Sequence, residues 1–357
     1  MSFRTAIQDA LNLTRSQRLI EATQRIQAAL QGRTQAAYEP VAPAHAKYPG
    51  KSVRPLAQVV QTLRKFKQSP FPLGKAGRGS LVEPEIVDGA QFLTRSFSCN
   101  AGSRTYKLYI PKHTPDTQRP LLIMLHGCKQ NPSDFALGTR MNTFAETHGM
   151  LVAYPAQTQS TNPSACWNWF NPSHQQSGMG EPAIIAGITE EIVNSYDIDK
   201  NKVFVAGLSA GGAMAVVMGE TYPELFSAVG VHSGLPYKSA NDVISAFAAM
   251  RGEAPQAKAV PNLRTIVFHG DADGTVAPSN GIDILGGAAL SKAETERVSG
   301  QFTRRVARDP NGLPIFEHWL LHGGGHAWSG GNAAGSYTDS SGPDASAEML
   351  RFFLEIK

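Results

Sequence analysis

Short apolar runs recur along residues 92–323, and most of them end in glycine or proline. The segments FLTRSFSC and RTYKLYIP alternate between apolar and polar positions across NAGS, which predicts a β-hairpin. Six further runs are almost wholly apolar and predict buried strands: LLIMLHG, LVAYPA, KVFVAG, AVGVHSG, TIVFHG and EHWLLHG. Helical patterns at 181–196 and 210–223 lie between several of them. This alternation predicts an α/β fold with a mostly parallel central sheet, helices on both faces, and function at the carboxyl ends of the strands.

The beginning of the chain has a different pattern. Apolar residues at helical spacing, a capping box at Thr14–Gln17 and a stop at Gly32 predict a helical hairpin extension over 1–31. Residues 32–84 are rich in proline, glycine and basic residues, and they predict a linker. One large α/β domain is then expected over 85–357.

Composition narrows the class of protein. The chain has 357 residues, of which 41% are hydrophobic and 17% charged, so it can bury a sizeable core. Because no run of about 18 apolar residues occurs, a membrane span is not expected. The N-terminus lacks the apolar segment of a secretory signal, and three cysteines are too few for a disulfide scaffold. These features predict a cytoplasmic protein.

The net charge of +4 conceals an asymmetry, because residues 1–80 contain 13 Lys and Arg but only 3 Asp and Glu. A solvated extension is one interpretation of this basic segment. Attraction to an anionic surface, such as a membrane, a granule or a nucleic acid, is another. A cleaved transit peptide is a third. The basic run RKFK is too short to support nucleic-acid binding by itself, so none is expected.

The sequence GLSAG places Ser209 at the junction between the predicted strand KVFVA and the predicted helix GGAMAVVMGETY. This strand–turn–helix setting is the one that a nucleophile elbow requires, whereas the five letters alone also fit a turn with a capping serine. Gly207, Ala210 and Gly211 supply the small residues that such a tight turn needs. We therefore expect Ser209 to be a nucleophile.

A serine hydroxyl requires a base to take its proton and an acid to orient that base. In this class of fold, the acid and then the histidine follow the serine along the chain. Asp271 and Asp273 both follow the strand TIVFHG, and the residues alone leave the choice between them open. His326 is the expected base because its glycine-rich loop can reach another loop. Three histidines at strand ends are expected to be structural supports: His126, His269 and His322.

The tetrahedral intermediate of acyl transfer needs an oxyanion hole of two backbone N–H donors. Ala210, the residue after the nucleophile, is expected to supply one of them. Cys128, in the loop LLIMLHGCKQN after the third strand, is expected to supply the other.

An aromatic cluster in ACWNWFNP contains Trp167 and Trp169, and Trp328 follows the expected base by two residues. They are candidates for a substrate-binding wall, with burial in the core as the alternative. The chain contains no H-E-x-x-H, C-x-x-C or Walker pattern, and its glycine-rich stretches lack the setting of a dinucleotide loop. We therefore expect no metal and no cofactor.

Five motifs taken together resemble the esterase, polyhydroxybutyrate (PHB) depolymerase family of α/β-hydrolases, to which feruloyl and acetylxylan esterases are related. They are LHGCKQ, CWNWF, GLSAGGAM, FHGDADGTV and GGGHAWSGG, and the likeness runs from Arg95 to Lys357. The family pattern H-G-x-x-D-x-x-V implies that Asp273 is the acid, and the family histidine corresponds to His326. The resemblance also implies that Cys128 and Cys166 are neighbours, bridged in an exported member.

The resemblance implies a serine esterase that works through an acyl-enzyme and needs no cofactor. Polyhydroxyalkanoate polyesters, their oligomers and short-chain esters are the expected substrates, and feruloyl or acetylxylan esters are the alternative. From another class of function, residues 1–80 could make the chain a granule-surface binding or scaffold protein. The basic N-terminus, without a secretory signal or a polymer-binding domain at the C-terminus, resembles intracellular members. A peptidase is ranked lower, because no amine-recognition acid is apparent.

Overall fold

The computed structural model describes residues 82–112, 117–254, 261, 263–287, 293–298 and 300–355. The predicted hairpin over 1–31 and almost all of the predicted linker over 32–84 lie outside these residues, so both remain predictions.

The described residues form ten strands of one sheet and a separate pair of two-residue strands. The strands of the large sheet are β1 (Gln91–Cys99), β2 (Gly102–Ile110), β3 (Arg119–Leu125), β4 (Leu151–Pro155), β5 (Ile198–Leu208), β6 (Ala228–His232), β7 (Arg264–Gly270), β8 (Glu294–Val298), β9 (Phe302–Arg308) and β10 (Pro314–Leu321). The small pair is β11 (Trp328–Ser329) and β12 (Thr338–Asp339). The helices are α4 (Pro132–Thr139), α5 (Met141–His148), η1 (Pro172–His174), α6 (Gly180–Ser195), α7 (Ala210–Thr221), α8 (Val243–Met250), α9 (Ser279–Leu285) and α11 (Ala345–Leu354).

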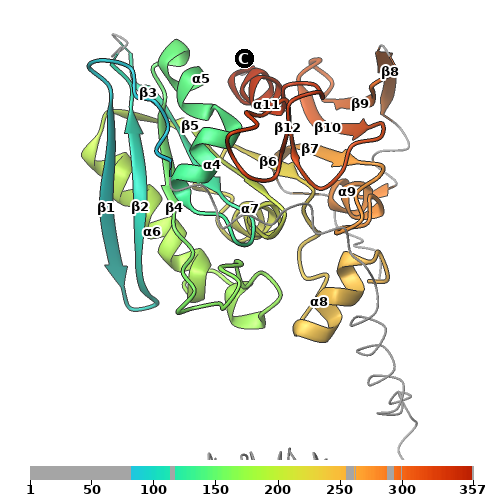
Figure 1. Cartoon of the computed structure of the whole chain (residues 1–357), viewed down its shortest axis with the longest axis horizontal. Helices are drawn as coiled ribbons and strands as arrows, with labels where there is room; N and C mark the ends of the chain where they lie inside the picture. Colours follow the sequence, from blue (N-terminus) through green and yellow to red (C-terminus); the bar gives the residue numbers. More distant parts are fainter. Residues whose placement is uncertain are drawn as a thin grey trace, which may run out of the picture. The chain divides into compact units, whose positions relative to one another are not determined.

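The strand order in the sheet is β1-β2-β4-β3-β5-β6-β7-β10-β9-β8 (Figure 1). The six central strands, from β4 to β10, are parallel, and antiparallel pairs flank them on both sides. The predicted hairpin is confirmed, because β1 pairs with β2 from Gln91 opposite Ile110 to Cys99 opposite Gly102. The architecture is that of an α/β-hydrolase, as the sequence predicts.

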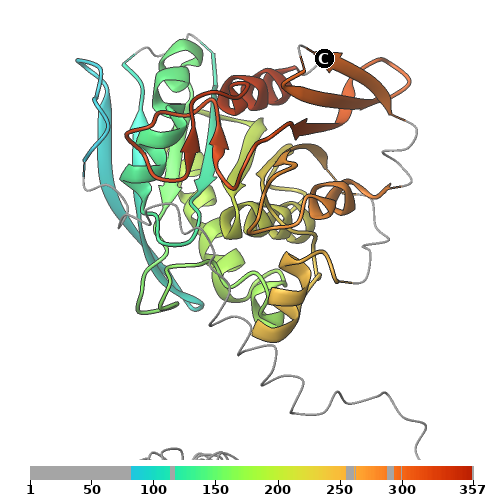
Figure 2. The same cartoon turned by 45° about the vertical axis from the view of Figure 1, so that its right-hand side comes forward.

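Two apolar layers lie on opposite faces of the sheet, because successive side chains of a strand point to opposite sides. On β3, Leu121, Ile123 and Leu125 belong to the layer that contains residues of α6 and α7, while Leu122 and Met124 belong to the other layer. That second layer contains residues of α4, α5 and α11, and the close position of α5 and α11 is visible in Figure 2. The sheet is therefore covered on both faces.

The parallel arrangement determines where function can lie. Since β3, β4, β5, β7 and β10 run in the same direction, the loops that follow them meet at one edge of the sheet. Among the described residues, no helix has the length and apolar character needed to cross a lipid bilayer.

The contact between α11 and β6 yields a test of the packing. A Cβ atom on Gly230 of β6 would lie 2.8 Å from Met349 Sδ and 2.9 Å from Phe353 Cζ. We expect Gly230→Ala to lower the free energy of unfolding by about 1–3 kcal/mol, because the added methyl overpacks this layer. Gly287→Ala is the matched control, since its nearest neighbour would be 4.0 Å away. Urea unfolding of both variants measures the difference, and equal midpoints would contradict this packing.

Candidate active site

Ser209 occupies a strained turn between β5 and α7. Its φ of 58° and ψ of −121° lie in a region that residues with a side chain rarely adopt. The Ser209 N–H donates to the carbonyl oxygen of His232 at 2.8 Å, which ties the turn to the end of β6. The Ser209 side chain makes no capping bond to α7, so the alternative of a capping serine is excluded.

Two glycines permit this turn by allowing close backbone contact. A Cβ atom on Gly211 would lie 2.0 Å from the carbonyl oxygen of Leu125, at the end of β3. One on Gly207 would lie 2.4 Å from the carbonyl oxygen of Gly211. Neither position can accommodate a side chain, so the GLSAG sequence presses the turn directly against the strand that precedes the predicted oxyanion loop.

The structure brings the three predicted triad residues together. The Oγ of Ser209 lies 2.9 Å from Nε2 of His326, and Nδ1 of the same imidazole lies 2.7 Å from Oδ2 of Asp273. The three side chains come from the loops after β5, β10 and β7, which meet at the edge of the sheet. Each distance is within the normal hydrogen-bond range, so the serine, imidazole and carboxylate form one continuous chain.

Asp273 is buried and held as an anion. Its Oδ1 accepts the backbone N–H groups of Thr275 at 2.8 Å and Val276 at 2.9 Å. Burial raises the pKa of the Asp273 carboxyl, but the contacts with His269 and His326 outweigh burial and hold that pKa well below its usual range. The carboxylate is therefore available to orient an imidazole.

Asp271, the competing acid, has a different partner. Its Oδ2 lies 3.1 Å from Nδ1 of His322, and its Oδ1 accepts the N–H of Gly323 at 2.7 Å. The Nε2 of His322 in turn lies 3.0 Å from Oγ1 of Thr303. These contacts connect the loop after β7 to the end of β10, so the Asp271 carboxylate bonds to His322 rather than to His326.

The predicted oxyanion loop lies beside the nucleophile. A Cβ atom on Gly127 would be 3.6 Å from Cβ of Ser209. The backbone that leads into Cys128 therefore lies beside the nucleophile. Ala210 is the first residue of α7, where helix N–H groups have no partner within the helix. Neither the Cys128 N–H nor the Ala210 N–H donates to another residue in the part of the chain that the structure describes. Both donors remain available for a ligand.

Gln130 is a part of this region that the sequence did not reveal. Its Oε1 accepts the N–H of Gly127 at 2.9 Å, and its Nε2 donates to Asp134 at 3.1 Å and to the carbonyl oxygen of Ser336 at 2.9 Å. It thus links the oxyanion loop to the segment that follows His326. Gln130 is the last residue of the motif LHGCKQ, but the motif alone does not show its contacts with Asp134 and Ser336.

The three tryptophans proposed as a substrate wall lie in the core, with exposed fractions of 0% for Trp167, 5% for Trp169 and 0% for Trp328. The Trp328 indole donates to Ser346 at 3.0 Å and packs on Phe135. The interpretation as an open wall is therefore corrected to core packing, because a buried indole offers no face to a substrate.

Cys128 and Cys166 form a disulfide across 38 residues of sequence. The resemblance implied that these cysteines are neighbours, and the structure confirms it. Cys99 is free and exposed.

The comparisons with known proteins agree with this geometry. A family model described as Esterase PHB depolymerase matches residues 104–294. The chain belongs to this esterase family. The chain is similar to poly(3-hydroxyalkanoate) depolymerase C of Paucimonas lemoignei, with 30% identity over 65% of this chain and 60% of the relative's length.

Two other relatives are named as an acetylxylan esterase and a feruloyl esterase. A probable acetylxylan esterase A of Aspergillus fumigatus is 30% identical over 58% of this chain and 60% of its own length. Feruloyl esterase B of Neurospora crassa is 26% identical over 71% of this chain and 90% of its own length. The solved acetyl xylan esterase from Aspergillus awamori shares the fold, with a TM-score of 0.59 and 20% identity over 74% of this chain and 98% of that one. This chain thus spans about three fifths of the first two curated relatives.

His126 provides a pH-dependent test of the region. Burial lowers its pKa from 6.5 to about 4, so the folded protein keeps it neutral while the unfolded chain takes up a proton below pH 6.5. Its contribution to stability is complete above pH 6.5 and is lost as the pH falls towards 4. In urea unfolding, we expect His126→Gln to reduce this acid-dependent loss by up to about 1.4 kcal/mol per pH unit.

The matched control is His148→Gln, because that histidine is exposed at the end of α5. We expect the control to keep the acid dependence of the wild type. An unchanged pH slope in His126→Gln would show that His126 does not titrate as a buried group.

Proposed function

We propose that the chain is a serine esterase that hydrolyses carboxylic esters through an acyl-enzyme. The observation that carries this proposal is the hydrogen-bonded chain from Ser209 through His326 to Asp273, at 2.9 and 2.7 Å, built on the strained turn after β5. Membership of an esterase family supports the same reaction class.

In the first half of the reaction, Oγ of Ser209 attacks the ester carbonyl carbon while Nε2 of His326 takes the hydroxyl proton. Asp273 fixes the imidazole with its proton on Nδ1 and stabilises the imidazolium that forms. The carbonyl oxygen becomes an anion that accepts the N–H groups of Cys128 and Ala210. The intermediate then collapses, the carbon–alkoxy bond breaks, and His326 protonates the departing alcohol.

In the second half, a water molecule attacks the acyl-enzyme. Nε2 of His326 takes a proton from the water, and the same two N–H groups stabilise the second anion. Collapse breaks the bond to Ser209 Oγ, which regains its proton from the imidazolium, and the carboxylic acid leaves. No step of the reaction requires a cofactor.

For the substrate, we propose hydroxyalkanoate polyesters, their oligomers and short-chain esters. The 30% identity to a poly(3-hydroxyalkanoate) depolymerase supports this class. The similarity to acetylxylan and feruloyl esterases supports acetyl or feruloyl esters as the second candidate. Binding of a granule or another anionic surface by residues 1–80 stays a prediction, because those residues lie outside the described part of the chain.

The cytoplasmic location predicted from the sequence stays a prediction, and the disulfide supports an alternative. The Cys128–Cys166 disulfide is of a kind that persists in oxidising compartments. We therefore propose an oxidising compartment as the alternative to the cytoplasm for the location of this protein.

Replacing the nucleophile tests the reaction. Ser209→Ala removes the attacking oxygen, so we expect kcat on chromogenic esters from acetyl to octanoyl to fall by at least about 10⁴-fold. Ser341→Ala, an exposed serine after β12, is the control and should retain full activity. Amorphous polyhydroxybutyrate, methyl ferulate and acetylated xylan, assayed in parallel, identify the substrate class. Equal activity of wild type and Ser209→Ala would exclude the proposal.

The two aspartates provide a matched pair for the acid. In Asp273→Asn, the amide cannot hold His326 in the required tautomer, so we expect kcat to fall by about 10³–10⁴-fold. Asp271→Asn, two residues away and bonded to His322, should cost less than about tenfold. Steady-state kinetics on one chromogenic ester measure both values, and a larger loss in Asp271→Asn would reverse the assignment.

A further inference from the structure

The loop between β4 and α6, residues 156–179, holds His126 at the start of the oxyanion loop. The backbone N–H of Gln157 donates to Nε2 of His126 at 3.0 Å. The indole N–H of Trp167 donates to the carbonyl oxygen of His126 at 3.1 Å. The imidazole is thus fixed through its ring and its backbone from the same neighbouring loop.

Cys128 and Lys129, which follow Gly127 in the oxyanion loop, are attached to this same segment. Cys128 is linked covalently to Cys166, and the N–H of Lys129 donates to the carbonyl oxygen of Ser164 at 2.9 Å. Lys129 and Ala165 both have positive φ, at 66° and 49°, so the two loops meet in conformations that need external support. The position of the Cys128 N–H therefore depends on the position of residues 157–168.

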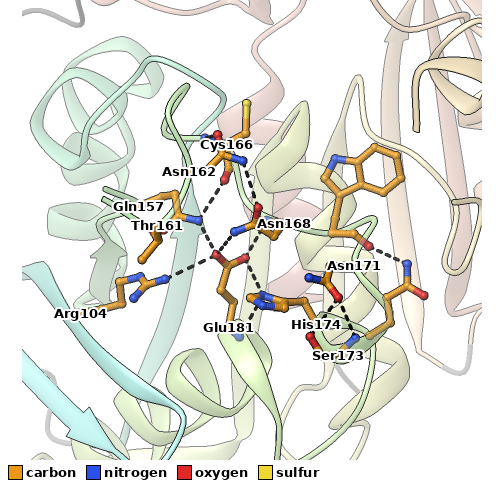
Figure 3. A network of polar contacts seen from close by, with 12 residues as sticks. Arg104, Gln157, Thr161, Asn162, Cys166, Asn168, Asn171, Ser173, His174 and Glu181 are labelled. Atoms are coloured by element: carbon orange, nitrogen blue, oxygen red, sulfur yellow. Dashed lines mark hydrogen bonds and ion pairs between the residues drawn. The ribbon is translucent and has the colours of Figure 1, made fainter. Parts of the chain in front are cut away.

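Glu181 organises those residues from the first turn of α6, as Figure 3 shows. Its exposed fraction is 1%, and its carboxylate accepts both the backbone N–H and the side-chain amide of Asn168 at 2.7 Å. It also accepts the side-chain amide of Gln157, which donates in addition to the carbonyl oxygen of Cys166 at 2.9 Å. One buried carboxylate thereby joins both ends of the segment.

Arg104 and His174 also lie beside this carboxylate. Nη2 of Arg104 lies 3.4 Å from Oε1, and Nδ1 of His174 lies 3.3 Å from Oε2. Burial raises the pKa of the Glu181 carboxyl, but the contacts with His174 and Asn168 outweigh it and lower that pKa. An ionised carboxylate is acceptor-only, which matches the donors that surround it.

We propose that Glu181 is a positioning residue for the oxyanion hole. It holds Gln157 and Asn168, and through them it fixes His126 and Cys166 so that the Cys128 N–H faces the carbonyl oxygen attacked by Ser209. This inference rests on the proposed esterase function. The side chain is neither nucleophile, acid nor base, so it acts only through the donor that it places.

The test compares Glu181→Gln with wild type on one chromogenic ester. The amide nitrogen of Gln replaces an acceptor oxygen by a donor, and it would face the donors of Asn168 and Gln157. The substitution therefore displaces residues 157–168 although the two side chains have the same size. A single oxyanion donor contributes about 10²–10³-fold to kcat, so a misplaced donor should lower kcat by about 10–100-fold. We expect KM to stay within about threefold, and the apparent pKa of kcat/KM to stay unchanged, because the triad is untouched.

A second measurement separates this role from a general loss of structure. The affinity for a trifluoromethyl ketone, which forms a tetrahedral anion on the serine, should fall in proportion to kcat/KM. Glu191→Gln is the matched control, since this carboxylate lies ten residues further along the same helix and accepts the Tyr106 hydroxyl at 2.7 Å. It should leave kcat within twofold of wild type.

Gln157→Ala covers the case in which Glu181→Gln does not fold. It removes the side-chain link to Glu181 and Cys166 but keeps the backbone bond to His126. The same fall in kcat and in inhibitor affinity supports the role of Glu181. A folded variant with wild-type kcat, or a rise in KM alone, overturns it. If wild type and Ser209→Ala are equally inactive on every ester, the proposed function itself fails.

Discussion

A close backbone contact at the edge of the sheet, between the β5–α7 turn and the end of β3, underlies the rest of the arrangement. A Cβ atom on Gly211 would lie 2.0 Å from the Leu125 oxygen and 2.6 Å from the His126 oxygen. Because the two segments touch through backbone atoms, no side-chain rearrangement can alter their separation. Ser209, which the turn presents, is therefore held beside the loop of His126 and Cys128, and the contacts of that loop with residues 157–168 complete its positioning. Pre-organisation of this kind is what makes an oxyanion hole effective, since the donors need not move during the reaction.

The opposite side of the site is assembled by a similar connection between two loops. The N–H of Asp271 donates to the carbonyl oxygen of Leu321 at 2.9 Å, and the N–H of Ala272 donates to that of Gly324 at 3.0 Å. These bonds join the loop after β7 to the loop after β10. Asp273 and His326 consequently belong to one rigid assembly, which meets the β5–α7 turn at the Ser209 hydroxyl. The alignment of Ser209 with His326 therefore depends on how the β5–α7 turn contacts the joined loops after β7 and β10.

Much of this could be predicted from the sequence, because strand and helix patterns are local and the motifs follow the strands of a parallel sheet. The turn at Ser209 has a signature in its small residues, and Asp273 and His326 occupy loops after predicted strands. The roles of Gln130 and Glu181 could not be predicted, because each depends on contacts between segments distant in the chain. The sequence left open, for the same reason, whether the tryptophans form a substrate wall or pack in the core. An aromatic residue has the same sequence signature whether its loop folds outward or over a core.

The oxyanion loop is secured in two chemically different ways, and they respond differently to the surroundings of the protein. The Cys128–Cys166 bond is covalent but survives only where thiols are oxidised. The Glu181 network is noncovalent and insensitive to redox conditions, and its burial protects it from screening by salt. In a reducing compartment the loop would depend on the carboxylate network alone, whereas in an oxidising one the two supports act together. In the role that we propose for Glu181, a buried charge, costly in itself, supports the oxyanion loop independently of the disulfide.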